Sequence, residues 1–333
     1  MPQRRPRTGG TEPAADAPRF AADLARLAGE GGRVALAVSG GPDSMALLLL
    51  AAAGRPGQVV VATVDHRLRP ESAEEATMVA RECAALGVPH ATLTPETPIA
   101  GASLQARARD ARYALLARWA RAQGATALAT AHHADDQAET FLMRAARGSG
   151  VSGLAGIRAQ VEIEGMRVVR PLLDWRRAEL RAIVRRAGVA FVDDPANQDP
   201  RHDRTRFRQL LDLHEWLGVP QLAASAQQLA EVDADLRATA DWLWAQRARE
   251  DAGEVLLDVA GLPRELRRRL ARRAVTAVRE AGAITEPDWS EATGIEPLLD
   301  ALAGGSGATQ AGVRANAKGD NWRFRPAPPR RAR

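Results

Sequence analysis

Three kinds of side chain are nearly missing from this chain of 333 residues, which has one cysteine, one tyrosine and one lysine. The lone Cys83 excludes a disulfide framework, a zinc ribbon and redox chemistry between two thiols. Long apolar runs are missing too, since the longest, residues 45–53, is far too short to span a bilayer. The N-terminal residues hold no apolar region typical of a signal peptide. We therefore expect a cytoplasmic protein with no membrane partner.

The basic residues are unusual in kind rather than in number. Arginine supplies 45 of the 46, and the formal net charge is only +5. A genome bias toward arginine explains much of this. The two ends are nevertheless basic, because residues 1–18 carry three arginines among Pro and Gly, and residues 322–333 carry five arginines and no acid. We interpret residues 1–18 as a disordered basic arm, and both ends favour a polyanionic partner because phosphate contacts release counterions.

Short apolar runs alternate with helix-length segments between residues 19 and 210. The sequence predicts strands at 34–38, 59–64, 91–93, 127–130 and 168–170, and helices at 45–53, 72–86, 104–123, 135–146 and 175–187. This alternation predicts an α/β fold with a doubly wound, mostly parallel sheet. In such a sheet, ligands bind beyond the carboxyl ends of the strands. We expect residues 19–210 to form one domain built on this sheet.

The pattern changes after residue 210. Residues 221–250 and 264–281 have helical periodicity, so we expect a helical domain over 211–303. In the first of these helices, the apolar positions expected on the core face are Leu222, Leu229, Val232, Leu236, Trp242 and Leu243. A glycine-rich break at 304–307 precedes a predicted hairpin with strands at 313–317 and 322–325. Residues 304–333 would then form a small hairpin region that ends in the basic tail.

The most informative motif lies where the first strand meets the first helix. Its residues are Ser39, Gly40, Gly41, Pro42, Asp43 and Ser44. A glycine pair that leads into a helix leaves backbone N–H groups unpaired at the positive end of the helix dipole, which makes a site for phosphate. The lysine of an ordinary P-loop is missing here. A carboxylate repels phosphate unless a divalent cation lies between them, so Asp43 is a candidate ligand of Mg²⁺.

A second cluster follows the strand predicted at 127–130. His133 precedes a helix on which Asp136 and Glu139 lie about one turn apart on the same face. Two carboxylates can hold an ammonium group or, together with a histidine, a metal ion. A capped helix with acids in its first turn explains the same residues without any ligand.

Two basic segments complete the candidate site. The first consists of Arg147, Gly148, Ser149 and Gly150, a basic residue followed by a flexible loop. It is a second candidate phosphate site, although such a loop is also an ordinary turn. The other is formed by Arg109 and Arg112, one turn apart on the helix that carries the only tyrosine, Tyr113. These arginines could contact phosphate or a base, or form a solvated basic face.

In combination, these motifs resemble those of the tRNA(Ile)-lysidine synthetases, which are pyrophosphate-loop ATPases. The matching blocks are residues 39–44, 64–69, 108–113, 131–140, 147–154, 170–173 and 194–199, in order along about residues 33–208. Two features depart from the family pattern. Residues 204–208 read Arg-Thr-Arg-Phe-Arg where the family has Arg-Asn-x-Ile-Arg, and the C-terminal region matches weakly.

The resemblance implies an adenine-nucleotide α-hydrolase-like fold and a ligase that joins free L-lysine to C2 of the wobble cytidine of tRNA(Ile) with anticodon CAU. ATP would adenylate the base and release pyrophosphate, and the lysine amine would then displace AMP. The resemblance also implies that residues 39–44 bind ATP and that Asp43 holds Mg²⁺. It places Asp136, Glu139 and His133 at the lysine site, with both acids and Asp43 as catalytic residues. By the same resemblance, residues 19–210 would form the pyrophosphate-loop ATP-binding catalytic domain and the domain over 211–303 would contact the tRNA. A homodimer is expected by analogy with relatives.

Other functions leave parts of the sequence unexplained. A tRNA thiolase of the same superfamily would need paired cysteines, and a glutamine-dependent amide synthetase would need a glutaminase domain with its own cysteine nucleophile. A non-catalytic RNA-binding protein would use the basic ends but leave residues 39–44 and 131–139 without a role. Turnover of ATP to AMP, with and without lysine and tRNA, separates these alternatives.

Overall fold

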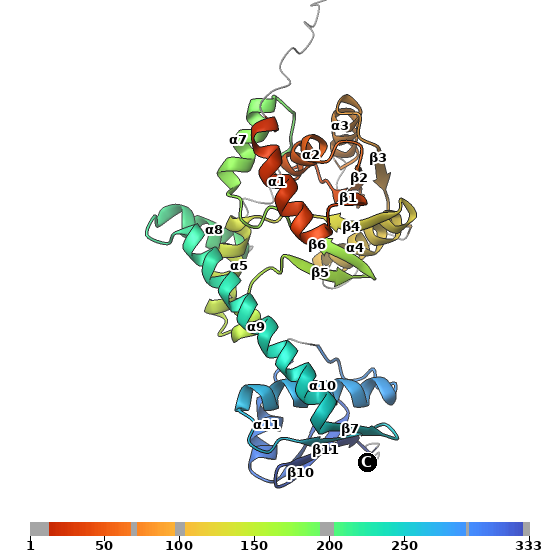
Figure 1. Cartoon of the computed structure of the whole chain (residues 1–333), viewed down its shortest axis with the longest axis vertical. Coiled ribbons are helices and arrows are strands. Elements are labelled where there is room, and N and C mark those ends of the chain that lie inside the picture. Colours follow the sequence, from red (N-terminus) through yellow and green to blue (C-terminus); the bar gives the residue numbers. More distant parts are fainter. Residues whose placement is uncertain (1–12, 68–71, 97–103, 194–202, 291–292, 329–333) are drawn as a thin grey trace, which may run out of the picture. The chain divides into compact units, whose positions relative to one another are not determined.

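The computed structural model describes residues 13–67, 72–96, 104–193, 203–290 and 293–328 (Figure 1). The chain divides into two compact units, Met1–Ala230 and Glu231–Arg333. Each unit has hydrophobic core clusters of its own. None of the described helices combines the length and the apolar character needed to cross a membrane.

A six-stranded sheet forms the centre of the first unit, with the order β3-β2-β1-β4-β6-β5. Its strands are β1 (Arg33–Ala37), β2 (Val59–Val64), β3 (His90–Leu93), β4 (Ala125–Ala129), β5 (Gln160–Ile163) and β6 (Met166–Val169). All neighbours pair in parallel except β5 and β6. The predicted doubly wound, mostly parallel sheet is therefore confirmed. The strand order reverses at β1, between β2 and β4, where ligands of such sheets bind.

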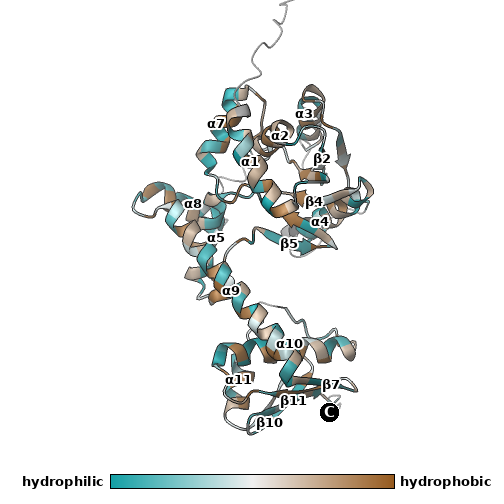
Figure 2. Cartoon of the chain, viewed as in Figure 1, coloured by the Kyte–Doolittle hydropathy of each residue, from teal (hydrophilic) through white to brown (hydrophobic). Residues whose placement is uncertain are grey.

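Helices cover both faces of this sheet, and others pack beside it. The helices of the first unit are α1 (Pro13–Ala28), α2 (Pro42–Gly54), α3 (Ser72–Ala85), α4 (Leu104–Ala122), α5 (Ala134–Ala146), α6 (Val151–Leu154), α7 (Arg177–Ala187) and α8 (Asp203–Leu213). Side chains of α1, α2, α3 and α7 share a core with one face, whereas α4 packs on the other face. Helix α2 is apolar nearly all round and brown in Figure 2, because it is buried against α1 and α7 as well as the sheet.

Two parts of the first unit differ from the sequence-based expectation. Residues 13–18, expected in a disordered arm, are helical, because Ala17, Phe20 and Leu24 of α1 are buried against the apolar α2. The rest of the expected arm lies outside the described residues. The antiparallel β5 was not predicted, since its alternating half-exposed residues form no apolar run.

Helix α9 (Val219–Arg247) begins in the first unit and ends in the second. The second unit contains an antiparallel sheet of order β7-β8-β11-β10-β9. Its strands are β7 (Ala248–Asp251), β8 (Glu254–Asp258), β9 (Gly307–Gln310), β10 (Val313–Lys318) and β11 (Asn321–Pro326). Helices α10 (Arg264–Ala281) and α11 (Glu296–Ala303) share a core with one face of this sheet.

The second unit corrects two further expectations. Val232 and Trp242, expected on the core face of α9, are 47% and 60% exposed. Leu243 is buried as expected, and Trp244, which was not expected on that face, is buried beside it. Because α9 contributes to separate cores near its two ends, no single apolar stripe runs along it. The predicted hairpin forms as β10 and β11, but it lies inside the five-stranded sheet rather than in a separate region.

Candidate active site

The loop between β1 and α2 forms a backbone cradle. Gly40 has a φ of 90°, and a Cβ at this position would lie 3.2 Å from Cε of Met78, so the loop requires glycine here. Gly41 caps α2, and Pro42 occupies the start of the helix, where a missing N–H group costs little. The other N–H groups of the first turn have no acceptor within the helix, which makes them available to an anion.

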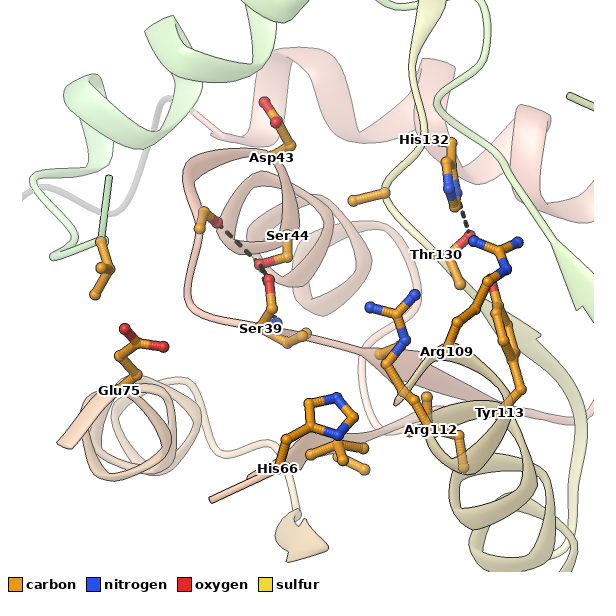
Figure 3. Close-up of a pocket in the computed structure, with 18 of the residues that line it drawn as sticks. Ser39, Asp43, Ser44, His66, Glu75, Arg109, Arg112, Tyr113, Thr130 and His132 are labelled. Atoms are coloured by element: carbon orange, nitrogen blue, oxygen red, sulfur yellow. Dashed lines mark hydrogen bonds between the residues drawn. The ribbon is translucent and has the colours of Figure 1, made fainter. Parts of the chain in front are cut away.

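Ser44 closes this loop from inside. Its Oγ donates to the carbonyl of Gly41 at 2.9 Å and accepts from the N–H of Ser39 at 3.1 Å (Figure 3). On the other side, the N–H of Val192 donates to the carbonyl of Gly40 at 2.9 Å. These hydrogen bonds fix the shape of the loop from both sides.

A cavity of about 570 Å³ opens beside this loop, at the carboxyl ends of β1, β2 and β4. Its wall includes most of the residues predicted from the sequence: Ser39, Gly41, Pro42, Asp43, Ser44, Arg109, Arg112 and Asp136. Gly40, His133, Glu139 and the 147–150 loop do not line it. The strand ends thus bring together segments that lie far apart in the sequence, as the sheet topology predicts.

His133 connects the two carboxylates of this wall. Its Nε2 lies 3.4 Å from Oδ2 of Asp43 and 3.6 Å from Oδ2 of Asp136. Its Nδ1 accepts the N–H of Asp136 at 3.3 Å, while Oδ2 of Asp136 accepts the N–H of His133 at 3.1 Å, which makes a reciprocal cap of α5. In the neutral ring the proton therefore lies on Nε2, the nitrogen that faces Asp43.

Burial and charge act in opposite directions on these groups. Burial lowers the pKa of His133, but the carboxylates of Asp136 and Asp43 outweigh it and raise that pKa above its usual value. Burial raises the pKa of Asp136, but the positive charges of His133 and Arg204 hold it below its usual value. Asp136 is therefore an ionised carboxylate at neutral pH, facing the cavity and able to accept a proton or hold a cation.

Helix α4 supplies a basic and aromatic wall. Arg109 and Arg112 of this helix line the cavity, and their guanidinium carbons lie 5.1 and 5.4 Å from the ring centre of Tyr113 (Figure 3). Burial lowers the pKa of Arg112, which remains a cation. Within the described residues, neither arginine makes an ion pair with an acid, so both charges face the cavity without a carboxylate partner.

The wall also contains His66, Thr130, His132 and Arg204, to which the sequence analysis assigned no chemical role. His66 follows β2, and Thr130 and His132 follow β4, so these three lie at the strand ends where the sheet topology predicts the site. The Nδ1 of His132 lies 2.9 Å from Oγ1 of Thr130, and burial lowers the pKa of His132 to about 3. This ring is neutral and offers a hydrogen bond rather than a charge.

Glu139 lies one turn beyond Asp136 but faces a different environment. Its side chain is fully buried, and its Oε1 accepts from Arg177 at 2.5 Å and from Arg208 at 2.8 Å. Nε of Arg204 lies 3.2 Å from Oε2, an ion pair without hydrogen-bond geometry. Three arginines therefore surround this carboxylate, and one of them, Arg204, also lines the cavity.

The 147–150 loop lies outside the cavity wall. Arg147 forms an ion pair with Asp203 at the start of α8, and Gly148 adopts a φ of 69°. Gly150 precedes the short α6 as its N-cap. This loop connects α5 to α6 and contacts α8, so a role in binding phosphate or a base stays a prediction.

Comparison with protein families gives a match over most of the first unit. Residues 17–214 match the PP-loop domain family. The match includes the cradle, the cavity wall from α4, and the α5 segment that carries Asp136.

Curated relatives extend this similarity along nearly the whole chain. The tRNA(Ile)-lysidine synthase of Novosphingobium aromaticivorans is 45% identical over 97% of this chain and 98% of its own length. That of Zymomonas mobilis is 44% identical over 90% of both chains. Among solved structures, the U34-tRNA thiolase NcsA of Methanococcus maripaludis, with its 4Fe-4S cluster, gives a TM-score of 0.53 at 16% identity, covering 64% of this chain and 76% of that chain. At this identity, the structural likeness concerns the fold alone.

Proposed function

Because the chain belongs to the tRNA(Ile)-lysidine synthase family, we propose that its cavity joins lysine to C2 of the wobble cytidine of a tRNA(Ile) with anticodon CAU, at the expense of ATP. The observation that carries this proposal is that the anion cradle, an ionised carboxylate and two arginines face one cavity. These are the groups needed for a reaction among a nucleotide, an amine and a base. The protein is then a ligase that forms a carbon–nitrogen bond.

In the first step, O2 of the cytidine attacks the α-phosphorus of ATP, and the bond between that phosphorus and the bridging oxygen breaks. The electron pair leaves with pyrophosphate, which the free N–H groups of the 39–44 cradle bind. The cradle is held by Ser44 before the ligand arrives, so it stabilises the developing charge with little reorganisation.

Asp43 fits a role in holding Mg²⁺ that accompanies the phosphates. Its Oδ1 is buried without a hydrogen-bond partner among the described residues, at the first turn of α2. The described residues contain no group of three or more acidic, histidine or cysteine side chains able to hold a metal. Mg²⁺ keeps water and phosphate ligands and needs only one or two carboxylates, so Asp43 could hold it without such a group. The ion would neutralise phosphate charge beside Asp43.

In the second step, the lysine amine attacks C2, the bond from C2 to the adenylate oxygen breaks, and AMP leaves. We assign Asp136 to hold the ε-ammonium group and to accept the proton that the amine must lose, because it is ionised and lines the cavity. Glu139 and His133, also predicted at the lysine site, are both buried behind the wall. Direct contact of either with lysine stays a prediction, and their contacts support roles through Arg204 and through the two aspartates.

Arg109 and Arg112 are the candidates to contact the adenylate phosphate or the extruded base. An enzyme that acts on a base must remove it from its stack, and the free-energy cost of this is lower for a nucleotide in a loop than for one in a duplex. Residues 19–210 would act as the catalytic domain and 211–303 would contribute tRNA contacts. A homodimer and a cytoplasmic location are part of the same proposal.

Mass spectrometry of the tRNA provides the test. The full-length protein is incubated with a tRNA(Ile) transcript, ATP, Mg²⁺ and lysine, and digests are searched for a cytidine enlarged by one lysyl residue. Omission of ATP or of lysine should each abolish the product, and a transcript with uridine at the wobble position should not react. Failure of the complete mixture, with a folded protein that binds ATP, would refute the proposal.

A further inference from the structure

The arginines of the second unit fall into two structural classes. Helix α10 is rich in arginine, so its sequence suggests a surface for a polyanion. In the structure its arginines are engaged instead. Five of them, Arg264, Arg267, Arg268, Arg269 and Arg273, make ion pairs with acids. Arg272 and Arg279 donate to backbone carbonyls. This helix is therefore largely neutralised by its own unit.

The outer face of the β7–β11 sheet is different. On β10 and β11 the inward residues Val313, Ala315, Trp322 and Phe324 are buried in the core, so the residues between them point away from it. These outward positions carry Arg314, Lys318 and Arg325, all exposed. We call these three residues the outer basic patch. In the described part of the chain, no acid makes an ion pair with any of them.

Two like charges of the patch face each other across neighbouring strands. Arg314 and Arg325 are directly opposite each other in the β10–β11 register. Like charges at such positions destabilise a strand pair. The next outward residue of β11, Arg323, is neutralised by Glu254, whose carboxylate lies 2.7 Å from its Nε. The sheet thus neutralises one outward arginine, and among the described residues the adjacent cross-strand pair has no acidic partner.

We propose that the outer basic patch, and not the arginine-rich helix α10, binds the phosphate backbone of the substrate tRNA. This rests on the proposed function for the identity of the RNA. Arginine side chains a cross-strand distance apart suit two phosphates or the two oxygens of one. The acids of the same face, Asp251, Glu254 and Asp258, lie on β7 and β8 rather than on β10. The charge is therefore positive on the side of the sheet where β10 lies.

The salt dependence of tRNA binding tests this assignment. The dissociation constant of the full-length protein for the tRNA(Ile) transcript is measured from about 0.05 to 0.3 M salt, a range in which counterion release dominates. R314Q/R325Q should flatten the slope of log K against log salt by about 1.4–1.8, since each lost phosphate contact contributes about 0.7–0.9. Affinity at about 0.1 M salt should fall on the order of tenfold.

Two matched variants make the result specific. R264Q/R268Q removes two positive charges from α10 and should leave the slope unchanged. R314K/R325K keeps the positive charge of the patch and should retain most of the wild-type slope. An unchanged slope in R314Q/R325Q, or an equal loss in R264Q/R268Q, overturns the proposal. Thermal unfolding confirms that the exposed substitutions preserve the fold.

The lysidine assay separates this inference from the proposed function. At saturating tRNA, R314Q/R325Q should form lysidine at the wild-type rate, with only the tRNA requirement raised. If the wild type forms no lysidine but its RNA binding loses slope in R314Q/R325Q, the proposed reaction fails while the patch stands. If lysidine forms and the slope does not change, the patch is a solvated face.

Discussion

His133 contacts both carboxylates that line the cavity, those of Asp43 and Asp136. It caps α5 through Asp136, and its Nε2 faces Asp43, yet it does not line the cavity itself. At the scale of single residues, the geometry therefore separates groups that line the cavity from groups that position them. Asp43 and Asp136 belong to the first kind, and the role proposed for each can be tested separately by substitution.

Asp43→Asn should reduce pyrophosphate release at least about a hundredfold, because removing one charged group at a site of developing charge costs about 3 kcal/mol of transition-state stabilisation. The amide keeps the shape of the side chain, so the loop should remain intact. Pyrophosphate release is measured over a series of Mg²⁺ concentrations. Glu74→Gln, an exposed change on α3, is the charge-matched control. A normal Mg²⁺-dependent rate in Asp43→Asn would remove the residue from the metal role.

Asp136→Asn should raise the KM for lysine roughly tenfold to a hundredfold, the value of one charge-assisted hydrogen bond. Adenylation should continue, so that activated tRNA accumulates. The asparagine can still accept the N–H of His133 and thus keep the cap of α5. Lysine dependence and adenylated intermediate are followed in single-turnover experiments. Loss of adenylation with an unchanged lysine KM would instead place Asp136 in the ATP site.

At the scale of elements, Glu139 joins three helices. Its carboxylate, on α5, binds Arg177 of α7 and both Arg204 and Arg208 of α8. Oδ2 of Asp135 adds to this junction by accepting the N–H of Arg177 at 2.8 Å. Because Arg204 also lines the cavity, the junction that stabilises the fold also determines where this guanidinium lies.

Glu139→Gln should destabilise the first unit by about 3 kcal/mol, since it leaves partly buried arginines without their counter-charge. It should also lower the reaction rate at saturating lysine, because Arg204 loses its ion pair and, of its described contacts, keeps only the hydrogen bond to Oγ1 of Thr140. Chemical denaturation and steady-state kinetics measure the two effects. Glu179→Gln, half-exposed at the start of α7, is the control and should cost less than about 1 kcal/mol. A stable Glu139→Gln protein with only a raised lysine KM would favour direct contact with lysine.

In the second unit, Glu296 provides a pH-dependent contact between α10 and α11. Hydrogen bonds from Arg268 and Arg264 lower the pKa of Glu296 to about 2 from its usual 4.5. A lowered carboxyl pKa stabilises the fold above the unfolded value and loses this effect as the pH falls toward the folded value. Glu296→Gln should lower the melting temperature at pH 7 by about 1–3 °C, because the pair is exposed.

The difference between Glu296→Gln and the wild type should shrink as the pH falls from about 4.5 toward 2. Melting curves at several pH values measure it, and Glu231→Gln, an exposed acid on α9, is the control. A difference that stays constant with pH would show that Glu296 contributes through packing rather than charge.

At the scale of the whole molecule, part of the basic C-terminal segment belongs to the core and sheet of the second unit. Residues 322–333 look like a basic tail, but Trp322 and Phe324 are buried in the second core and β11 lies between β8 and β10. Deletion of residues 322–333 should therefore abolish cooperative unfolding of the second unit, because each buried aromatic contributes about 3–5 kcal/mol. Deletion of residues 329–333 alone is the control and should preserve it. Calorimetry distinguishes the two, and retained cooperativity after the larger deletion would contradict the assignment.

The sequence alone determines the parts of this protein that depend on neighbours along the chain. The βα alternation between residues 33 and 187 predicts the parallel sheet, because each apolar run and helical stripe is a local pattern. Residues 39–44 predict the cradle, because its shape follows from two glycines, a proline and a serine in succession. These motifs also predict a common site, because strand ends of a parallel sheet meet at one edge.

Tertiary structure decides what each charge touches. Asp136 and Glu139 share a helical face in the sequence, yet one faces the cavity and the other is surrounded by arginines from α7 and α8. Acids such as Glu296 and Asp233 neutralise arginines of α10. Arg314 and Arg325, by contrast, lie opposite each other, and no described acid forms an ion pair with either. Periodicity identifies which residues share a face, but an ion pair depends on which distant segment packs against that face. Packing of the whole chain decides this.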